Sequence, residues 1–295
     1  MAREYRSTIK LAGIIGHPIK HSYSPLIQNA AFEQSGLDFI YLPFDIHPSR
    51  LRDAVRGLAA LNCIGFNVTI PHKERILELL DELSPEVQVI GAVNTVVNDG
   101  SRLHGYNTDA LGFVSSLKPF SDQIGGETVA VLGAGGAARA VLYGLITQFK
   151  PQRIYLLNRH LERAESLRID FQKTLSYGAI TTLELSASNA IDCLTNCKLI
   201  VNATPVGTYP DVEESPILTD KSFTPGQIIM DLVYNPPETE LIRLAGKKGA
   251  TVVGGSEMLL RQASESFELW TGMPMPVEKV RSVLIHHMHA SSVKG

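Results

Sequence analysis

The chain has 295 residues, of which 44% are hydrophobic and 19% are charged. This composition is typical of a soluble globular protein and excludes disordered and collagen-like chains, while the length predicts two domains. The 27 Lys and Arg against 30 Asp and Glu give a net charge of −3, which excludes a basic protein that binds nucleic acid or anionic membranes, so any anion must be bound locally.

The cysteines and the apolar runs indicate the cellular compartment of the protein. Cys63, Cys193 and Cys197 form neither a CxxC pair nor a zinc-type cluster, so we interpret them as reduced packing residues and predict no metal site. No stretch approaches the roughly 18 apolar residues of a membrane span, and the N-terminus lacks the apolar core of a signal peptide. The sequence therefore predicts a cytoplasmic protein.

In the first part of the chain, strand-like apolar runs alternate with helix-like stretches. The strand-like runs are LAGIIG, FIYLPFDI, CIGFNVTI and AVNTVV, and the helix-like stretches are Pro25–Ser35, Ser49–Leu61 and His72–Leu83. This alternation predicts a largely parallel sheet covered by helices.

A second series of strands and helices follows. TVAVLGAGG is a compact strand that ends in a glycine loop, and a helix over ARAVLYGLI and a strand over RIYLLN come next. Further strand-like runs are Leu199–Ala203, Ile228–Leu232 and Thr251–Val253. The tail from Glu257 has apolar residues at three- and four-residue spacing, which predicts helices.

Together these patterns predict an α/β protein of two domains with a cleft between them. The first is an α/β substrate domain over residues 1–112, with C-terminal helices over 263–295 packing back on it. The second is a Rossmann-type dinucleotide-binding domain over 113–262. The chain crosses between them near 108–125 and 255–265, where we expect a hinge.

The glycine loop Gly133–Ala138 matches the GxGxxG/A pattern, directly after a strand and before a helix. Gly133 allows a tight turn, Gly135 lets backbone N–H groups approach a pyrophosphate, and the helix starting near Ala137 directs its positive end toward it. The alternative is a tight packing turn, but the strand over Arg153–Leu157 after it favours a dinucleotide site.

The end of that next strand indicates which dinucleotide is bound. NAD-binding folds usually place Asp or Glu there, whereas this chain has Asn158 and Arg159, then Arg163 on the same helical face. Two guanidiniums can hold a 2′-phosphate, so we predict NADP. The alternative is a solvated helix start, but basic residues in a first turn oppose the helix dipole.

Four polar segments stand at the ends of apolar runs in the first half: HSYSP from His21, NVTIPHK from Asn67, AVNT from Ala92 and GYNTD from Gly105. Such groups at strand ends suit a polyhydroxylated carboxylate. Singly, each has a structural alternative: Ser22 and Ser24 as helix caps, Asn67 and Thr69 as turn residues, and Lys73 as a solvated helix residue.

With these motifs in order, the chain resembles the shikimate dehydrogenase family from about Gly13 to Gly272. The shared motifs are HSYSP, NVTIPHKE, GAVNTV, GYNTDA, GAGGAARA, NRHLER, NATPVG, DLVYNP and GGSEMLLRQA. The resemblance implies reversible NADPH-dependent reduction of 3-dehydroshikimate to shikimate, in the shikimate pathway of aromatic amino acid biosynthesis.

The resemblance also implies roles for single residues. Lys73 and Asp109 match the catalytic pair, in which the Lys73 ammonium, held by the carboxylate, protonates the developing alkoxide. The residues implied to surround the substrate are Ser22, Ser24, Thr69, Asn94, Asp109, Tyr234 and Gln262. Those implied to contact the cofactor are Gly133, Ala134, Gly135, Gly136, Ala137, Asn158, Arg159, Arg163, Thr204, Val206, Gly255 and Met258.

Two departures from the family pattern concern histidines. His160 follows Arg159 where many members have Thr, and His72 stands where some have Phe. His17, His21, His72 and His104 lack ligand spacing, and we interpret His286, His287 and His289 as an exposed tail.

Two alternative functions remain open. One is a quinate/shikimate dehydrogenase that uses NAD or either cofactor, and the other is a non-catalytic NADPH-binding regulator on the same fold. Monomer and homodimer both fit the sequence.

Overall fold

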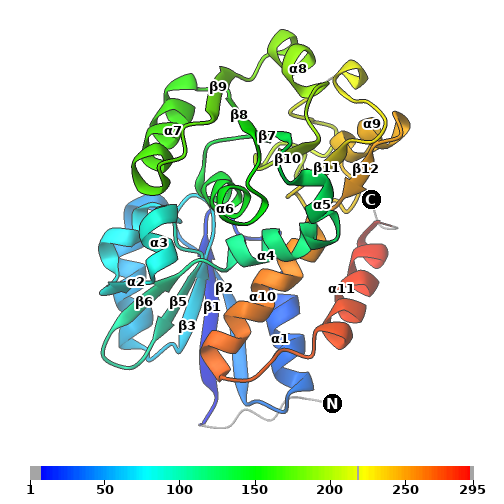
Figure 1. The fold of residues 1–295 in the computed structure, drawn as a ribbon. Coiled ribbons are helices and arrows are strands. Elements are labelled where there is room, and N and C mark those ends of the chain that lie inside the picture. Colours follow the sequence, from blue (N-terminus) through cyan, green and yellow to red (C-terminus); the bar gives the residue numbers. More distant parts are fainter. Residues whose placement is uncertain (1–7, 218, 293–295) are drawn as a thin grey trace. The chain divides into compact units, whose positions relative to one another are not determined.

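The computed structural model describes residues 8–217 and 219–292, and the chain divides into two compact units (Figure 1). The first unit is Met1–Thr108 with Gln262–Gly295, and the second is Asp109–Arg261. The division falls within two helices, α4 (Thr108–Leu117) and α10 (Gly255–Thr271). It assigns Asp109 to the second unit and Gln262 to the first, whereas the predicted ranges placed Asp109 in the first domain and Gln262 in the second. The outer ends of the predicted ranges, at 1–7 and 293–295, lie outside the described residues.

The sheet of the first unit has six strands in the order β2-β1-β3-β5-β6-β4. These strands are β1 (Lys10–Gly16), β2 (Phe39–Asp45), β3 (Gly65–Val68), β4 (Glu82–Leu83), β5 (Thr95–Asn98) and β6 (Leu103–Tyr106). β1 pairs in parallel with β2 and β3, as the alternation predicts, whereas β5 is antiparallel to both β3 and β6. The β5–β6 hairpin needs no crossover helix, which explains why no helix separates these two strands.

The helices of this unit are α1 (Ser24–Gln34), α2 (Leu51–Ala60), α3 (Pro85–Ile90), the distal part of α10 and α11 (Val277–Ser292). The helices predicted at Pro25–Ser35 and Ser49–Leu61 are confirmed. The helix predicted over His72–Leu83 is wrong, because only a 3-10 helix, Arg75–Leu79, forms there. Asp81 instead pairs with β6, since its backbone N–H donates to the Leu103 carbonyl at 3.0 Å and its carboxylate accepts from Leu103 N–H at 2.7 Å. Tertiary pairing overrides the local helical pattern.

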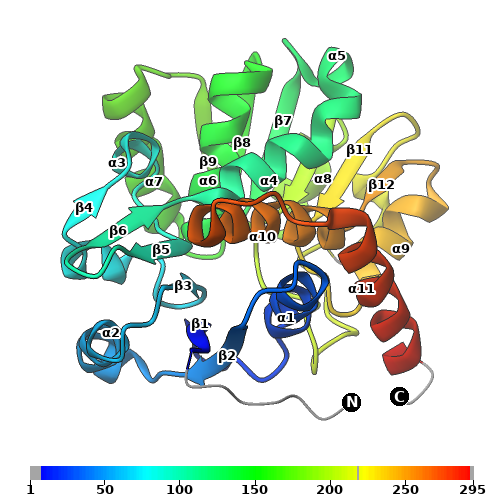
Figure 2. The ribbon, with the colours of Figure 1, turned by 90° about the horizontal axis from the view of Figure 1, so that it is seen from below.

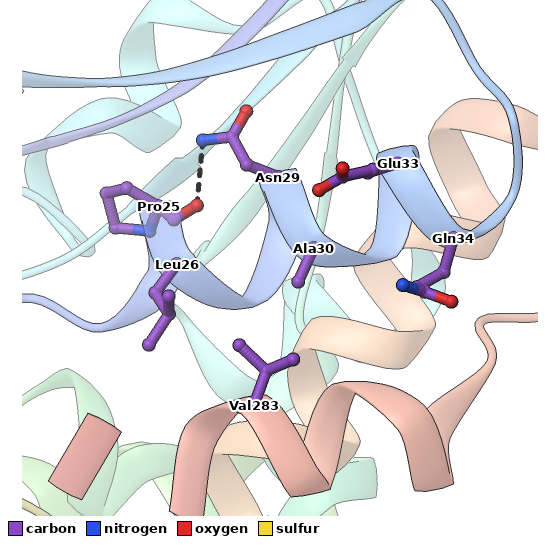
Figure 3. Close-up of a pocket in the computed structure, with 7 residues that line it drawn as sticks. All are labelled: Pro25, Leu26, Asn29, Ala30, Glu33, Gln34 and Val283. Atoms are coloured by element: carbon purple, nitrogen blue, oxygen red, sulfur yellow. Dashed lines mark hydrogen bonds between the residues drawn. The ribbon is translucent and has the colours of Figure 1, made fainter. Parts of the chain in front are cut away.

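The helical tail is confirmed by α10 and α11, and α11 lies beside α1 (Figure 2). His287 contacts the Tyr23 ring edge-on at 5.6 Å, and both His286 and His287 are exposed, as predicted. The side chain of His289 lies outside the described residues. Between α1 and α11 the surface forms a hollow of about 460 Å³, lined by seven residues shown in Figure 3. None of the candidate site residues lines this hollow.

The second unit contains six parallel strands in the order β12-β11-β10-β7-β8-β9. They are β7 (Thr128–Leu132), β8 (Arg153–Asn158), β9 (Ile180–Glu184), β10 (Leu199–Asn202), β11 (Ile228–Asp231) and β12 (Thr251–Val253). This is the strand order of a doubly wound Rossmann sheet. The predicted Rossmann-type fold is confirmed.

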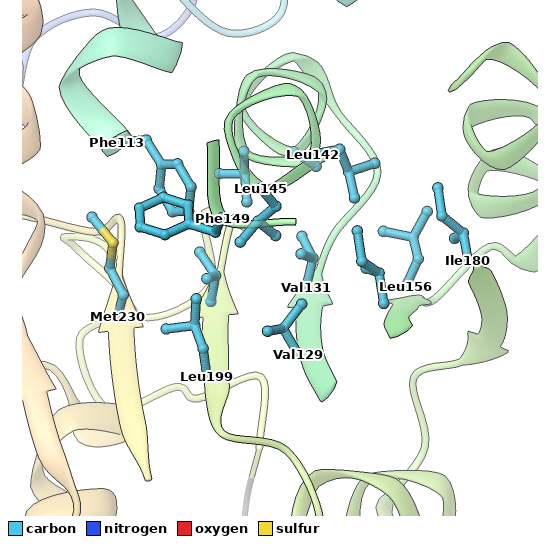
Figure 4. Packing of buried hydrophobic residues seen from close by; sticks show 14 of the residues in the cluster. Phe113, Val129, Val131, Leu142, Leu145, Phe149, Leu156, Ile180, Leu199 and Met230 are labelled. Atoms are coloured by element: carbon cyan, nitrogen blue, oxygen red, sulfur yellow. The ribbon is translucent and has the colours of Figure 1, made fainter. Parts of the chain in front are cut away.

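The helices of the second unit pack on this sheet through apolar side chains. They include α5 (Ser121–Ile124), α6 (Gly136–Gly144), α7 (Leu161–Leu175), α8 (Ala187–Leu194) and α9 (Glu240–Lys247). Val129 and Val131 of β7 meet Leu142 and Phe149 in the core seen in Figure 4. Because the strands are covered by helices, they are nearly continuous apolar runs, which is why the sequence shows them clearly.

All three cysteines are buried and free, which confirms their interpretation as packing residues. Burial raises the pKa of the Cys63 thiol to about 11 and that of Cys197 to about 12, so both thiols stay protonated at neutral pH. Among the described residues, no group of three or more His, Cys, Asp or Glu side chains is arranged to hold a metal ion. None of the described helices is long and apolar enough to span a bilayer.

Candidate active site

Polar residues gather at one edge of the first sheet, where β3 and β6 end and β5 begins. Because β5 is antiparallel to both neighbours, its first residues share this edge. The Asn94 carbonyl accepts from Val68 N–H at 2.8 Å, and Asn94 N–H donates to the Tyr106 carbonyl at 3.1 Å. Asn94 is therefore fixed between two strand ends. It precedes a strand instead of following one, so the rule about carboxyl ends of parallel strands does not by itself account for its position.

Hydrogen bonds fix the orientation of the buried Asn94 side chain. Its Oδ1 accepts from the backbone N–H of Thr108 at 2.7 Å, which can only donate, so Nδ2 must face the Thr108 hydroxyl, at 2.8 Å. Nδ2 also lies 3.4 Å from Oε1 of Gln262, a residue of α10 that is only 8% exposed. Two amide groups predicted to bind substrate are thus brought together within the first unit.

A buried polar cluster lies next to this amide pair. Its residues Asn67, Thr95 and Thr108 belong to the polar segments that the sequence singles out, but nothing in the sequence indicates that they meet one another and Ser266. Asn67 lies inside β3, so the alternative that it closes a turn is wrong. Its Oδ1 accepts from the Tyr41 hydroxyl at 2.6 Å, and its Nδ2 lies 3.0 Å from the Asn94 carbonyl, from Thr95 Oγ1 and from Ser266 Oγ. Asn67 is a polar residue in the fully buried strand Gly65–Val68. A buried polar side chain needs hydrogen-bond partners, so its presence in an apolar strand indicates that other polar groups lie nearby.

Lys73 lies in a turn after β3, in the loop that approaches the same edge. Its backbone carbonyl accepts from Val93 N–H at 2.8 Å, which places Lys73 beside the residue that precedes Asn94. The turn begins with a hydrogen bond of 2.9 Å from His72 N–H to the Thr69 carbonyl. Lys73 is half-buried and outside any helix, so the alternative of a solvated helix residue is wrong.

His72 is fully buried behind this turn. Its Nε2 lies 2.7 Å from the Ile46 carbonyl, so Nε2 carries the hydrogen, and among the described residues Nδ1 has no hydrogen-bond partner. Burial lowers the pKa of His72 below its ordinary value of 6.5, and the charges of His17 and Arg75 lower it further. Folding therefore favours the neutral imidazole, although the hydrogen bond to the Ile46 carbonyl opposes part of this effect.

This burial predicts an acid-sensitive fold that His72→Phe makes less sensitive. With a folded-state pKa below the unfolded value of 6.5, the stability contributed by neutral His72 is present above 6.5 and is lost as pH falls through 6.5 toward the folded value. We expect the free energy of unfolding of the wild type to fall relative to His72→Phe between pH 7.5 and 5.5, as measured by urea titration. Between pH 7.5 and 8.5 the difference between the two proteins should stay constant, and a constant difference down to pH 5.5 would contradict the assignment.

The two candidate carboxylate-binding serines stand at the start of α1. Ser24 is the first helical residue and is buried, and its backbone N–H donates to Ser22 Oγ at 3.2 Å. Tyr23 occupies the N-cap position without a side-chain capping bond. Ser22 thus orders the helix start, and the buried Ser24 does not cap it.

The predicted glycine loop follows β7 in the second unit. Gly133 has φ of +103°, and a Cβ there would lie 3.0 Å from Thr204 Cγ2, so both conformation and space demand glycine. At Gly135 a Cβ would meet no protein atom within 4 Å, so the chain itself leaves open space there. No side chain caps α6, whose first helical bond joins Arg139 N–H to the Gly135 carbonyl. The Gly133 N–H donates to the Leu157 carbonyl at 2.7 Å, whereas the N–H groups of the first helical turn point out of the helix start, where anions bind, so this loop fits a pyrophosphate.

The segment carrying Thr204 is fixed by a buried carboxylate that the sequence did not single out. Asp231, at the end of β11, accepts from Asn202 Nδ2 at 2.9 Å and from the Thr239 hydroxyl at 2.6 Å. Asn202 Oδ1 in turn accepts from the Thr204 N–H at 3.0 Å and from its hydroxyl at 2.7 Å. Burial raises the pKa of Asp231 to about 6, and the hydrogen bonds from Thr239, Asn202 and the Val233 N–H oppose that rise.

Arg159 and Arg163, which are predicted to bind the 2′-phosphate, do not lie on one face of a helix. β8 ends at Asn158 and α7 begins at Leu161, so Arg159 lies in the connection and only Arg163 is helical. Asn158 Nδ2 donates to the His160 carbonyl at 2.9 Å and shapes this connection. Both guanidiniums belong to exposed residues at the carboxyl end of β8.

The remaining candidates lie elsewhere in the second unit. Ala134 and Gly136 belong to the glycine loop and the start of α6, Ala137 to its first turn, and Val206 to the loop after β10. Gly255 is required by packing, because a Cβ there would lie 2.5 Å from the Leu232 carbonyl oxygen, and Met258 belongs to the apolar core. Tyr234 follows β11 and is half-buried, and Asp109 is a buried residue in the first turn of α4.

Comparisons with known proteins agree with this geometry. A family model described as shikimate dehydrogenase substrate binding domain matches residues 14–96, and one described as shikimate 5'-dehydrogenase C-terminal domain matches residues 255–285. A protein of Methanopyrus kandleri named shikimate dehydrogenase (NADP(+)) is 44% identical over 94% of this chain and 96% of its own length.

Two solved structures are similar over nearly the whole chain. A shikimate dehydrogenase in complex with NADP+ has a TM-score of 0.88 at 36% identity, covering 97% of this chain and 98% of that one. A quinate dehydrogenase from Corynebacterium glutamicum in complex with NAD has a TM-score of 0.84 at 29% identity, covering 95% of this chain and 100% of that one.

Proposed function

The chain belongs to the shikimate dehydrogenase family, and from that premise we propose that it catalyses the reversible NADPH-dependent reduction of 3-dehydroshikimate to shikimate. Membership of a family and a shared fold do not determine which substrate is used, so the proposal depends on the residues of the site. The observation that carries it is the oriented amide pair of Asn94 and Gln262 at the strand edge that Lys73 approaches. The activity belongs to aromatic amino acid biosynthesis.

The amide pair suits a ring hydroxyl. Asn94 Nδ2 and Gln262 Oε1 lie 3.4 Å apart, which is long for a direct hydrogen bond. A hydroxyl that bridges them accepts from the first and donates to the second, so both of its hydrogen-bonding functions are used. We assign Thr69 to a further ring hydroxyl, and Ser22, Ser24 and Tyr234 to the carboxylate.

We assign Lys73 and Asp109 the roles of the catalytic pair. In the reducing direction the Lys73 ammonium donates a proton to the oxygen that becomes the hydroxyl, and its charge stabilises the developing alkoxide. Asp109 balances that charge and contacts a ring hydroxyl. In the oxidising direction Lys73 accepts the same proton.

NADPH supplies the hydride when it is bound. We propose that the N–H groups at Gly135 and Gly136 hold the pyrophosphate, and that Asn158, Arg159 and Arg163 bind the adenosine ribose and its 2′-phosphate. The remaining contacts are assigned to Gly133, Ala134, Ala137, Thr204, Val206, Gly255 and Met258. Most residues that we assign to the substrate lie in 1–112, with Tyr234 and Gln262 as the exceptions, and those that we assign to the cofactor lie in 113–262.

We also propose that the protein works in the cytoplasm on small-molecule ligands, without nucleic acid, as a monomer or homodimer. Its buried free thiols are compatible with a reducing compartment.

A two-by-two assay tests the proposal, with shikimate or quinate as the substrate and NADP or NAD as the acceptor. We expect kcat/KM to be highest for shikimate with NADP. A preference for quinate or NAD would instead support the alternative of a quinate/shikimate dehydrogenase. This alternative is included because a quinate dehydrogenase in complex with NAD is among the similar structures. Absence of turnover with every pair, combined with tight NADPH binding, would identify the non-catalytic regulator.

A further inference from the structure

We infer that Ser266 is a positioning residue for substrate binding, acting through Gln262 and Asn94. This inference rests on the proposed function. Ser266 lies one turn after Gln262 in α10, and its side chain is fully buried. It has no place among the residues that the motifs assign to substrate or cofactor, and its hydroxyl does not reach solvent.

The Ser266 hydroxyl joins three separate parts of the first unit. Its Oγ donates to the Gln262 carbonyl at 3.0 Å, lies 3.0 Å from Asn67 Nδ2 of β3, 2.8 Å from Thr95 Oγ1 of β5 and 3.2 Å from Thr108 Oγ1 at the start of α4. A hydroxyl donates one hydrogen bond and accepts two, so the bond to the Gln262 carbonyl uses its hydrogen, and the contacts with Asn67, Thr95 and Thr108 share its two acceptor sites. One oxygen atom, Ser266 Oγ, therefore connects the members of the cluster.

The contacts of Ser266 bear on both members of the amide pair. Thr108 supplies two groups that orient Asn94, its backbone N–H and its hydroxyl, and Thr95 Oγ1 lies 3.1 Å from Asn94 Oδ1. The bond to the Gln262 carbonyl fixes the turn of α10 that carries the other amide. Removing the Ser266 hydroxyl therefore loosens Asn94 and Gln262 together, whereas an ordinary buried serine supports only its own helix.

The variant Ser266→Ala tests this role, with Ser116→Ala as the matched control. Ser116 is also a buried helical serine that donates to the carbonyl four residues earlier, at 2.8 Å to Gly112, and it belongs to no cluster with Asn94. We expect Ser266→Ala to raise the KM for shikimate by roughly five- to tenfold, in the range of one lost hydrogen bond, with the KM for NADP unchanged. Ser116→Ala should change neither KM, although both variants lower the melting temperature.

A double variant with Gln262 distinguishes positioning of the amide pair from a general loss of stability in the first unit. In a Gln262→Ala background, Ser266→Ala should raise the shikimate KM by a smaller factor than in the wild type, because one of the two amides that it positions is gone and only Asn94 remains. Equal effects in both backgrounds, or an equal rise in both KM values, would overturn the inference.

The proposed function can fail independently. If the wild type does not oxidise shikimate, the activity assignment is wrong, and crystal structures of wild type and Ser266→Ala still decide the positioning. Changed side-chain orientations at Asn94 and Gln262 would support it, and unchanged orientations would refute it.

Discussion

Replacing Lys73 by alanine is expected to lower kcat by about 100- to 10,000-fold, the usual contribution of a positioned general acid and base. Lys73 lies in a turn that backbone hydrogen bonds hold on both sides, so truncating its side chain leaves the loop in place. The KM for shikimate should change far less than kcat, because the ring hydroxyls are assigned to other groups. Initial rates of NADPH formation over a range of shikimate concentrations, at saturating NADP, give both kcat and the KM for shikimate.

Two further variants make this result specific to the ammonium group. Lys73→Met keeps most of the aliphatic chain and should lose as much activity as Lys73→Ala. Lys10→Met removes an exposed lysine at the start of β1. The start of β1 lies at the end of the sheet opposite to the strand ends near Lys73, so this variant should retain wild-type kcat. Near-normal turnover in Lys73→Ala would reject the assignment of Lys73 as the proton donor.

The second unit could be predicted closely because its signals are local. The strand over Thr128–Leu132, the positive φ at Gly133 and the helix from Gly136 follow one another in the chain, and the pattern alone identifies the turn. Its parallel strands are buried on both faces, so they stand out as continuous apolar runs. The strand Ile180–Glu184 was missed because it is an edge strand and three of its five residues are polar.

The polar cluster of the first unit could not be predicted, because its members are distant in sequence. Asn67, Thr95 and Ser266 meet only after β3 pairs with β5 and α10 covers them. Serine in a long helix such as α10 normally indicates a solvated position, and nothing local marks it as fully buried. The mispredicted helix over His72–Leu83 failed for a related reason, since pairing with β6 outweighs helical periodicity there.

Replacing Arg159 by alanine is expected to raise the KM for NADP by about 10- to 100-fold while leaving the KM for NAD nearly unchanged. A charge-assisted hydrogen bond to phosphate contributes roughly 1.5–3 kcal/mol, and NAD lacks that phosphate. Arg159 is exposed and lies in the connection between β8 and α7, where a Rossmann fold holds the adenosine ribose. Selectivity for NADP over NAD should therefore fall by the same factor.

The matched control for Arg159 is Arg153, an exposed arginine at the opposite end of β8. Arg153→Ala removes the same charge near the other end of β8, so any change in NADP affinity caused by net charge alone appears in both variants. Arg163→Ala should give a smaller loss than Arg159→Ala, because only Arg159 lies in the connection itself, and the double variant should approach equal use of the two cofactors. Ionic strength supplies an independent check, since added salt should weaken NADP binding to the wild type more than to Arg159→Ala. Equal losses of NADP and NAD in Arg159→Ala would show that Arg159 supports the loop and does not bind the 2′-phosphate.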